Sequence, residues 1–411
     1  MGNVPNLRFL EFSGEWKKMK VSELLDFYST NSLSWEQLDY NNGKIKNLHY
    51  GLIHKGVPTM VDVAYDYLPY IKEESMPKSF TLFKEGDVAF ADASEDTNDV
   101  AKAIEVVNCD NQQIVSGLHT IHGRDNSNQT VIGYKGYAFA SDSFHKQIRR
   151  IAQGTKVFSI SARNFDEVYI GIPSKEEQTK IAKLLIAIDK RIATQNKIID
   201  KLQSLISGLN DFLHLQVGGL STSFEELGTS YSGLSGKSGD DFGKGKPYIT
   251  YLNIYSNSIV NEEQVDYVII GDNEKQNTLL YGDLLFTLSS ETPDEVGIGA
   301  VYLGESDKYY LNSFCFGLHM TTANKVYSPY LAYLVSNSIF RKFIYPLAQG
   351  STRFNLQKND FMKKKFLLPT FENQKEIARI LNALSSKLET ERKLLLNYQE
   401  QKQYLLGAMF I

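Results

Sequence analysis

The chain has 411 residues, of which 42% are apolar and 22% charged, a usage typical of folded globular domains that excludes a globally disordered chain. The length is too great for one ordinary domain and predicts two or three. Lysine and arginine total 44 against 48 acidic residues, a net charge of −4, so any nucleic-acid surface must come from local clustering of cations.

The start of the chain and its cysteines predict the compartment. Residues 1–20 contain no apolar core of a signal peptide, and no stretch is long and apolar enough to span a membrane. The only cysteines, Cys109 and Cys315, lie far apart, which favours a reducing environment over a disulfide scaffold. We therefore expect a cytoplasmic protein with no membrane contact.

An internal repeat dominates the sequence. Residues 153–155 (Gln-Gly-Thr) align with residues 349–351 (Gln-Gly-Ser) at an offset of 196 residues, and the same register places Gly86-Asp87 on Gly282-Asp283. The N-terminal parts of the two halves match less well and need a shifted offset. The sequence therefore predicts two related but non-identical halves.

The first part of each half is predicted to be a globular domain of mixed α/β class. These parts cover residues 1–172 and 220–368 and contain short β-rich runs separated by Gly, Asn and Asp. Residues 248–254 and 283–288 are two such runs. We expect both to be strands within similar heads.

The second part of each half is predicted to be one long helix. The helices cover residues 173–219 and 369–411, with Pro173 and Pro369 at or just before the first turn. Seam positions follow alternating steps of four and three, the a/d pattern of a coiled coil, and are apolar except for the equivalent polar breaks Gln195 and Glu391. This seam comprises Ile181, Leu185, Ile188, Ile192, Ile199 and Leu202 in the first helix and Ile377, Leu381, Leu384, Leu388 and Leu395 in the second. A surface helix on its own domain is the alternative, but so long a strict seam favours pairing of the two helices.

The repeat resembles the specificity-subunit family of type I restriction–modification enzymes over essentially the whole chain. The helix entry P-x-x-x-x-Q-x-x-I-A occurs at residues 173–182 and 369–378, and an A-Q-G-[ST] turn and a G-D-x-x-F strand precede each copy. The resemblance implies two target-recognition domains separated by helices that pair as an antiparallel coiled coil, each domain recognising half of a split, asymmetric target in double-stranded DNA.

The resemblance also implies partners. These are two adenine-N6 methyltransferase (modification) subunits and ATP-driven translocase/nuclease (restriction) subunits. S-adenosylmethionine, ATP and Mg²⁺ would then be bound by the partners, and this chain would bind no cofactor.

Candidate DNA-contacting residues occur at equivalent places in the two halves. Cations gather between Arg341 and Lys365, with a counterpart from Lys146 to Arg163, which suggests phosphate contacts; a solvated helical face is the alternative. The A-Q-G-[ST] turns suit phosphates, and Arg353 suits either phosphate or guanine, unless the turns only cap the next element. The candidates are Lys146, Arg149, Arg150, Gly154, Thr155, Lys156, Lys237, Lys244, Ser290, Thr292, Gly350, Ser351, Thr352, Arg353 and Lys358.

Three loops among these candidates have their own alternatives. Residues 93–97 and 288–293 follow a strand and suit base recognition, although the acidic first loop also fits a solvated one. Residues 233–238 approach the phosphate-loop pattern, but Tyr231 stands where that pattern requires glycine. We expect a DNA-facing loop that uses Lys237 and Lys244 there, and no ATP site.

No catalytic constellation is apparent in the sequence. No two prolines adjoin, so a methyltransferase [ND]-P-P-[YF] box is absent, and His119 and His122 lack Cys or acidic partners at metal-binding spacing. We therefore predict a non-catalytic DNA-recognition subunit without a metal. The alternative is a coiled-coil scaffold whose two heads bind proteins or small ligands, for which the two basic clusters would have no purpose.

Overall fold

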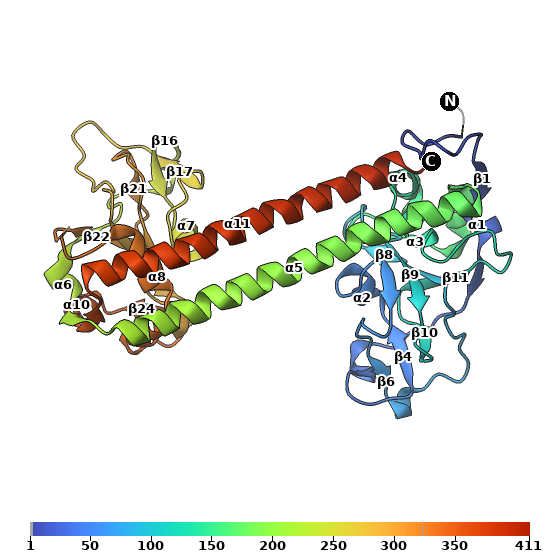
Figure 1. The fold of residues 1–411 in the computed structure, drawn as a ribbon, viewed down its shortest axis with the longest axis horizontal. Helices are drawn as coiled ribbons and strands as arrows, with labels where there is room; N and C mark the ends of the chain where they lie inside the picture. Colours follow the sequence, from blue (N-terminus) through green and yellow to red (C-terminus); the bar gives the residue numbers. More distant parts are fainter. Residues whose placement is uncertain (1–2, 323) are drawn as a thin grey trace. The chain divides into compact units, whose positions relative to one another are not determined.

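The computed structural model describes residues 3–322 and 324–411. The chain divides into two compact units, unit 1 with Met1–Asn196 and Lys393–Ile411, and unit 2 with Lys197–Arg392. Each unit holds one globular head and one segment of each long helix (Figure 1). The units therefore do not coincide with the two sequence halves, because each head packs against a helix segment contributed by the other half.

The two predicted long helices are confirmed as α5 (Lys175–Val217) and α11 (Phe371–Ala408). They contain 43 and 38 residues, or about 65 and 57 Å at a rise of 1.5 Å per residue. Each begins two residues after its proline. The hydroxyl of Ser174 accepts a hydrogen bond from the amide of Glu177 at 3.2 Å, and the Thr370 hydroxyl makes the equivalent cap at 3.4 Å.

A buried glutamine ties each helix start to its head. The Gln178 amide donates to the carbonyls of Gln129 and Pro173, and its oxygen accepts from the amide of Val131 at 2.9 Å. Gln374 makes the same three kinds of bond in unit 2. Both side chains are fully buried. The repeated P-x-x-x-x-Q motif is therefore a structural joint between helix and head.

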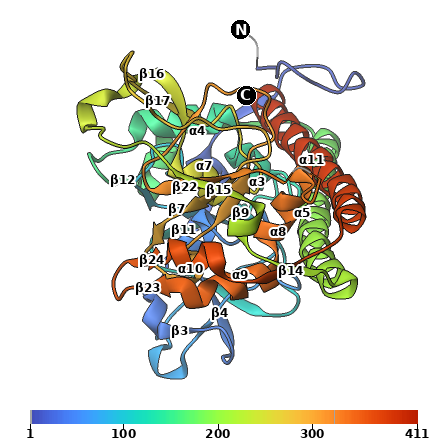
Figure 2. The ribbon, with the colours of Figure 1, turned by 90° about the vertical axis from the view of Figure 1, so that its left-hand side faces the viewer.

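The predicted seam residues are buried or half-buried, as a helix-pairing seam requires. Ile181, Leu185, Ile188, Ile199, Ile377 and Leu381 are buried, and Ile192, Leu202, Leu384, Leu388 and Leu395 are half-buried. In unit 1, Asp189 pairs with Lys402 at 2.6 Å, and Arg191 lies over the ring of Tyr398 at 5.8 Å. From Asp189 to Arg191 the residue number rises along α5, while the contacted residue of α11 changes from Lys402 to Tyr398. The two segments therefore run antiparallel, and Figures 1 and 2 draw them side by side.

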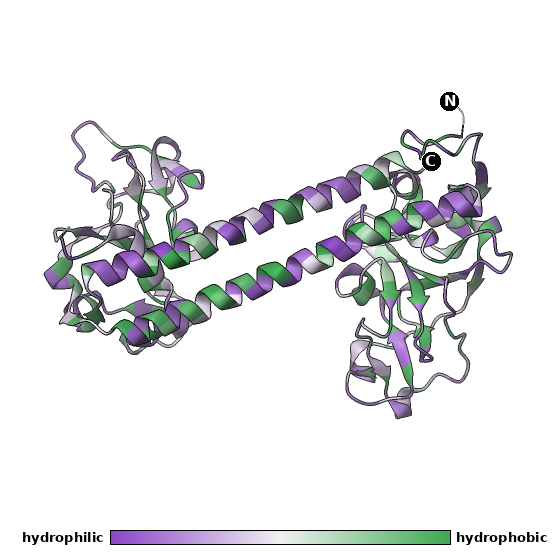
Figure 3. Cartoon of the chain, viewed as in Figure 1, coloured by the Kyte–Doolittle hydropathy of each residue, from purple (hydrophilic) through white to green (hydrophobic). Residues whose placement is uncertain are grey.

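The helix segments of unit 2 also share a core. Leu209 and Leu213 of α5 pack in the same cluster as Ile377 and Leu381 of α11. Figure 3 shows hydrophobic and hydrophilic residues alternating along both long helices, as expected when one stripe of each helix is buried.

Head 1 is built on a five-stranded mixed sheet. Its strands, in spatial order, are β2 (Asp26–Tyr28), β11 (Thr120–Arg124), β7 (Val88–Ala91), β9 (Ala103–Asn108) and β5 (Met60–Asp62). A second sheet has the order β10 (Gln113–Ser116), β4 (Ile45–Leu48), β6 (Tyr70–Ile71) and β3 (Leu38–Asp39). The helix α4 (Asp142–Ile151) packs Phe144 and Ile148 into the core beside Phe90.

Head 2 repeats this plan with fewer strands. The central sheet has the order β15 (Gly228–Ser232), β22 (Cys315–Met320), β18 (Leu284–Thr287) and β20 (Gly299–Val301). The second sheet has the order β17 (Val265–Val268), β16 (Phe242–Ile249) and β21 (Tyr310–Leu311). The mixed α/β class predicted for both heads is confirmed.

One predicted strand is wrong in part. The run 283–288 contains β18 as expected, but the run 248–254 leaves the sheet at Ile249 and continues as the helix α7 (Tyr251–Ser256). The hydroxyl of Thr250 accepts from the amide of Asn253 at 3.1 Å and caps this helix. A local cap thus ends a strand that β-propensity alone would extend.

The G-D-x-x-F motif also has a structural explanation. Gly86 and Gly282 have φ angles of 86° and 88°, in the left-handed region, directly before the central strand. The carboxylate that follows accepts a bond from the backbone of its own turn, Asp87 from Lys84 and Asp283 from Leu280. Each motif therefore forms the tight turn into the central strand of its head.

The two buried carboxylates have different partners. Asp87 accepts from Arg124 at 2.6 Å and contacts His122 at 2.8 Å. Although burial opposes ionisation, these bonds hold the pKa of Asp87 below its ordinary value. Asp283 instead meets His319 at 2.8 Å and accepts from Tyr231, and burial raises the pKa of its carboxyl.

Candidate nucleic-acid interface

In head 1, two of the candidate segments lie together. Gln153 and Ser159 exchange backbone hydrogen bonds of 3.1 and 2.8 Å, which close a hairpin over the residues between them. The strand β12 (Phe158–Ser159) at the end of this hairpin pairs with β8 (Ala93–Ser94). We call residues 153–159 glycine hairpin 1 and residues 93–97 loop 1. The hairpin therefore lies beside the loop that follows the central strand β7.

Head 2 has the same arrangement. The strand β24 (Phe354–Leu356) pairs on one side with β23 (Ala348–Gln349) and on the other with β19 (Ser289–Ser290). We call residues 348–356 glycine hairpin 2 and residues 288–293 loop 2. Segments more than fifty residues apart in sequence thus form one surface at equivalent places in both heads.

The glycines of the hairpins are required by the backbone. Gly154 and Gly350 have φ angles of 144° and 147°. A Cβ atom on Gly154 would lie 1.9 Å from the carbonyl oxygen of Val157, and one on Gly350 would lie 2.1 Å from that of Arg353. The two glycines therefore shape the hairpins, while the neighbouring candidates Thr155, Lys156, Ser351 and Thr352 are exposed.

A short helix contacts each loop. The sequence analysis did not predict these helices or their contacts. In head 2, Tyr251 of α7 donates to the carbonyl of Ser289 at 2.9 Å, and Tyr255 donates to Glu295 at 2.8 Å. In head 1, His54 of α2 (Tyr50–His54) contacts the carbonyl of Ala93 at 3.0 Å. One sequence feature could have indicated these helices. In each half, two aromatic residues four positions apart, Tyr50 and His54 or Tyr251 and Tyr255, follow a strand of the second sheet.

The candidate cations of head 1 lie on α4 and on glycine hairpin 1. Lys146, Arg149 and Arg150 are exposed on α4, and Arg149 donates to the side chain of Asn98 at 3.2 Å, directly after the loop. Lys156 is exposed at the tip of glycine hairpin 1. Arg149 therefore lies next to loop 1 and Lys156 on the hairpin, while Lys146 and Arg150 are exposed on the same helix as Arg149; exposed cations of this kind suit phosphate contacts.

The basic cluster expected in head 2 does not form as one patch. Arg341 donates to the carbonyls of Asp294, Val296 and Gly297 at 2.7 to 2.8 Å. Lys364 donates to the carbonyl of Phe343 at 2.7 Å, and Lys365 forms an ion pair with Glu226. These three cations are engaged within the head, whereas Lys342 and Lys363 of the same segment are exposed, so phosphate binding by this segment stays a prediction.

Other candidates of head 2 are also held by the fold. Lys358, at the start of α10 (Lys358–Lys363), lies 5.0 Å from the ring of Phe316, and burial lowers its pKa. Ser290 donates to Glu295 at 3.1 Å and is buried, whereas Thr292 of the same loop is exposed. Arg353 stays on the hairpin, where its Nε atom donates to Ser289 at 3.2 Å.

The pair Lys237 and Lys244 does not join this surface. The Lys237 side chain is only 8% exposed, pairs with Glu274 and donates to the carbonyl of Ile269 at 2.6 Å. The prediction that its ammonium group faces DNA therefore loses its basis. Lys244 is exposed between Gly243 and Gly245, where β16 bulges against β17, and among the described residues it forms no hydrogen bond with glycine hairpin 2 or loop 2.

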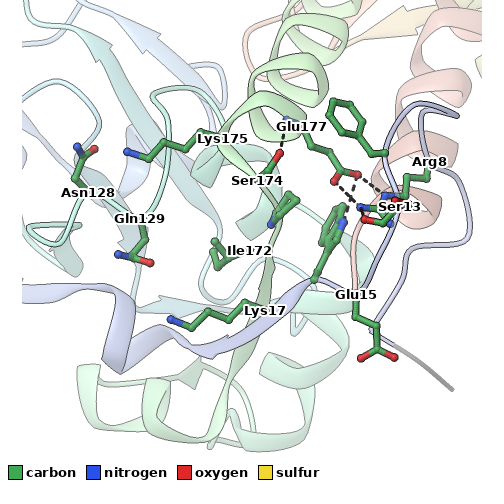
Figure 4. Close-up of a pocket in the computed structure, with 13 residues that line it drawn as sticks. Arg8, Ser13, Glu15, Lys17, Asn128, Gln129, Ile172, Ser174, Lys175 and Glu177 are labelled. Carbon is green, nitrogen blue, oxygen red and sulfur yellow. Dashed lines mark hydrogen bonds and ion pairs between the residues drawn. The ribbon is translucent and has the colours of Figure 1, made fainter.

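A cavity of about 500 Å³ lies at the start of α5 in unit 1 (Figure 4). Arg8 forms a bidentate ion pair with the buried Glu177 at 2.7 and 2.8 Å, and Trp16 donates to the same carboxylate at 3.3 Å. Asn128 and Gln129 of its lining follow β11, which runs antiparallel to β7. This cavity therefore lies at the opposite end of the central sheet from loop 1.

Two further findings concern metals and membranes. Within residues 3–322 and 324–411, no cluster of three His, Cys, Asp or Glu side chains is arranged to hold a metal ion. Among the helices that the structure describes, none combines the length and apolar character needed to cross a bilayer.

Two related heads, each with a glycine hairpin beside a loop and each joined to a long helix, define a tandem two-domain protein. The family model of the type I restriction modification DNA specificity domain matches the chain twice, at residues 13–204 and 228–398. The chain belongs to this family of type I restriction–modification specificity subunits.

Relatives and solved structures agree with this assignment. The chain is 22% identical to the putative type I restriction enzyme MjaX specificity subunit of Methanocaldococcus jannaschii, over 97% of this chain and 93% of the relative. It is 23% identical to the MjaVIII specificity subunit of the same organism, over 62% of this chain and 64% of that relative's length.

Two solved structures share the fold. The type I restriction–modification S subunit from M. genitalium matches with a TM-score of 0.53 at 18% identity, covering 99% of both chains. A chain from a study of complex assembly and conformational transition of the type I restriction–modification system matches with a TM-score of 0.60 at 14% identity, covering 95% of this chain and 96% of that one.

Proposed function

We propose that this chain binds a split, asymmetric sequence in double-stranded DNA, one half with each head, and performs no chemistry itself. The observation that carries the proposal is the repeated glycine hairpin beside a strand-end loop, with exposed hydroxyls and a cation at its tip. Hydroxyls, cations and backbone amides of this kind position a protein on phosphates, and side chains of the adjacent loop contact base edges. Family membership favours this function over a scaffold that binds proteins or small ligands.

The asymmetry of the proposed target follows from the differences between the two surfaces. Glycine hairpin 1 carries Lys156 and Val157 beside a loop with Glu95 and Asp96, whereas the matched positions of head 2 are Thr352 and Arg353 beside a loop with Glu291 and Thr292. The two cores share aromatic residues at matched positions, with Phe90, Phe144 and Phe165 in head 1 and Phe286, Phe340 and Phe361 in head 2. Two heads with a common scaffold and unlike contact surfaces would select different half-sites.

The proposal includes partner subunits that dock on the helices. Ile198, Leu205 and Phe212 of α5 are spaced by seven residues and are 37%, 51% and 55% exposed. Such a stripe lies outside the seam, and an exposed apolar row of this kind marks a protein contact. We assign it to a methyltransferase subunit. Two such subunits and the restriction subunits would bind S-adenosylmethionine, ATP and Mg²⁺, and the complex would work on DNA in the cytoplasm.

Selection from a pool of random duplexes tests the proposal. The full chain, co-expressed with its methyltransferase partner, should enrich two short conserved blocks separated by a fixed number of unread base pairs. A variant with Thr155→Ala and Lys156→Ala should bind with lower affinity, because it loses one hydroxyl and one cation from glycine hairpin 1. Enrichment of no sequence by the wild-type complex would contradict the proposed function.

A further inference from the structure

We propose that Arg353 recognises a guanine in the half-site bound by head 2, and that its counterpart Val157 makes the corresponding base contact of head 1 apolar. This inference rests on the proposed DNA-recognition function and assigns a specificity-determining position within it.

The guanidinium of Arg353 is oriented by two neighbours. Its Nε atom donates to the hydroxyl of Ser289 at 3.2 Å, and its carbon atom lies 5.7 Å from the ring centroid of Phe314. The residue is exposed, and within the described chain its two Nη atoms form no hydrogen bond with protein. With Nε engaged, the edge formed by the two Nη atoms remains available as a pair of parallel donors.

The anchor itself is rigid. Ser289 is 5% exposed, its carbonyl accepts from the Tyr251 hydroxyl at 2.9 Å, and its backbone pairs with Asn355 in the sheet of glycine hairpin 2. Gly350 fixes the turn that brings Arg353 to this place. The side chain is therefore held before binding, which lowers the entropy cost of a directional contact.

A fixed pair of donors matches guanine, which presents its O6 and N7 acceptors side by side in the major groove, and bidentate arginine is the commonest specific contact to it. A phosphate can also accept two parallel arginine donors, but Ser351 and Thr352 next to Arg353 already offer exposed hydroxyls for phosphates. The anchor of Arg353, Ser289, belongs to loop 2, which suits base edges. This placement favours base recognition by Arg353.

The repeat identifies the equivalent position in head 1. The offset that places Gly154 on Gly350 places Val157 on Arg353. The geometry agrees, because the carbonyl oxygen that faces the glycine belongs to Val157 in one hairpin and to Arg353 in the other. Val157 is 53% exposed. An exposed apolar group at a base edge suits the methyl group of thymine, so the two heads differ at one matched position.

Reciprocal substitutions test this inference in the full chain co-expressed with its methyltransferase partner. Random-duplex selection should show a guanine in one half-site of the wild type. Arg353→Lys keeps the charge but loses the paired donors, and Arg353→Val copies head 1. Both should reduce the preference for that guanine by roughly 5- to 150-fold and leave the other half-site unchanged. Val157→Arg should introduce a guanine preference in the other half-site.

The outcomes separate this inference from the proposed function. A wild type that enriches no sequence contradicts both. A wild type that enriches a split target, with an unchanged guanine preference in Arg353→Lys and Arg353→Val, overturns the inference alone. An affinity loss that is equal for all sequences also overturns it, because that result identifies Arg353 as a phosphate contact. Both positions are exposed, so thermal denaturation of each variant should match that of the wild type.

Discussion

Replacing Gly350 by alanine should disable head 2 without unfolding it. The added Cβ atom would lie 2.1 Å from the carbonyl oxygen of Arg353, where contacts below 3.0 Å essentially never occur, and φ at this position is 147°. Relieving such strain requires a different turn, at a cost of about 1–3 kcal/mol. The hairpin is exposed and its neighbours Ser351 and Thr352 bury no core, so this cost opens the hairpin locally.

The expected loss of affinity follows from that local cost. If binding needs the native hairpin, a penalty of about 1–3 kcal/mol lowers specific affinity by roughly 5- to 150-fold. Titration of the selected duplex, with fluorescence anisotropy as the readout, measures this change. Thermal denaturation should show a nearly unchanged transition, because the core of head 2 keeps all its contacts.

A matched glycine provides the control. Gly208 lies within α5, and a Cβ atom there would meet nothing within 4 Å. Gly208→Ala should therefore stabilise the protein by roughly 0.5–1 kcal/mol through helix propensity and leave DNA affinity unchanged. If Gly350→Ala binds the selected duplex as tightly as the wild type does, the hairpin is not part of the interface.

Three further predictions concern electrostatics and the helices. Asp87→Asn should cost about 3–5 kcal/mol at pH 7, because it leaves the largely buried Arg124 unpaired. Because the pKa of Asp87 is lower in the folded state than in the unfolded state, its contribution to the free energy of unfolding is present above the unfolded pKa and is lost as the pH falls through the folded pKa. Urea denaturation should therefore show a smaller difference in stability between Asp87→Asn and the wild type at pH 3 than at pH 7. An equal difference at the two pH values would contradict the ion-pair argument. Neutralising Lys146, Arg149, Arg150 and Lys156 together should reduce the slope of log affinity against log salt by about 0.9 for each lost phosphate contact, and an unchanged slope would assign them to a solvated face. Inserting four residues after Thr194 adds about 6 Å to α5 and should lengthen the unread spacer by one or two base pairs in methylation-site mapping; an active variant with an unaltered spacer would show that the helices do not set the spacing.

The candidate interface was only partly predictable from the sequence. The A-Q-G-[ST] motifs predicted turns, and the structure has a hairpin at each, because glycine at a left-handed turn is a local requirement. The cations were harder to assign. In the sequence, Arg341 and Lys237 are candidate DNA contacts of the same kind as Arg149. In the structure, carbonyls of distant segments accept hydrogen bonds from Arg341 and Lys237, whereas Arg149 remains exposed beside loop 1.

The sequence by itself determined the repeat, the two α/β heads and the two long helices with their seam. These features depend on local periodicity, on caps such as Ser174 and on turns that need glycine, all of which act over a few residues. Tertiary structure alone decided that α2 and α7 support the two loops and that each head packs against a helix segment from the other half of the chain. It also decided which cations remain exposed, because that depends on carbonyls and carboxylates that long-range folding brings to each side chain.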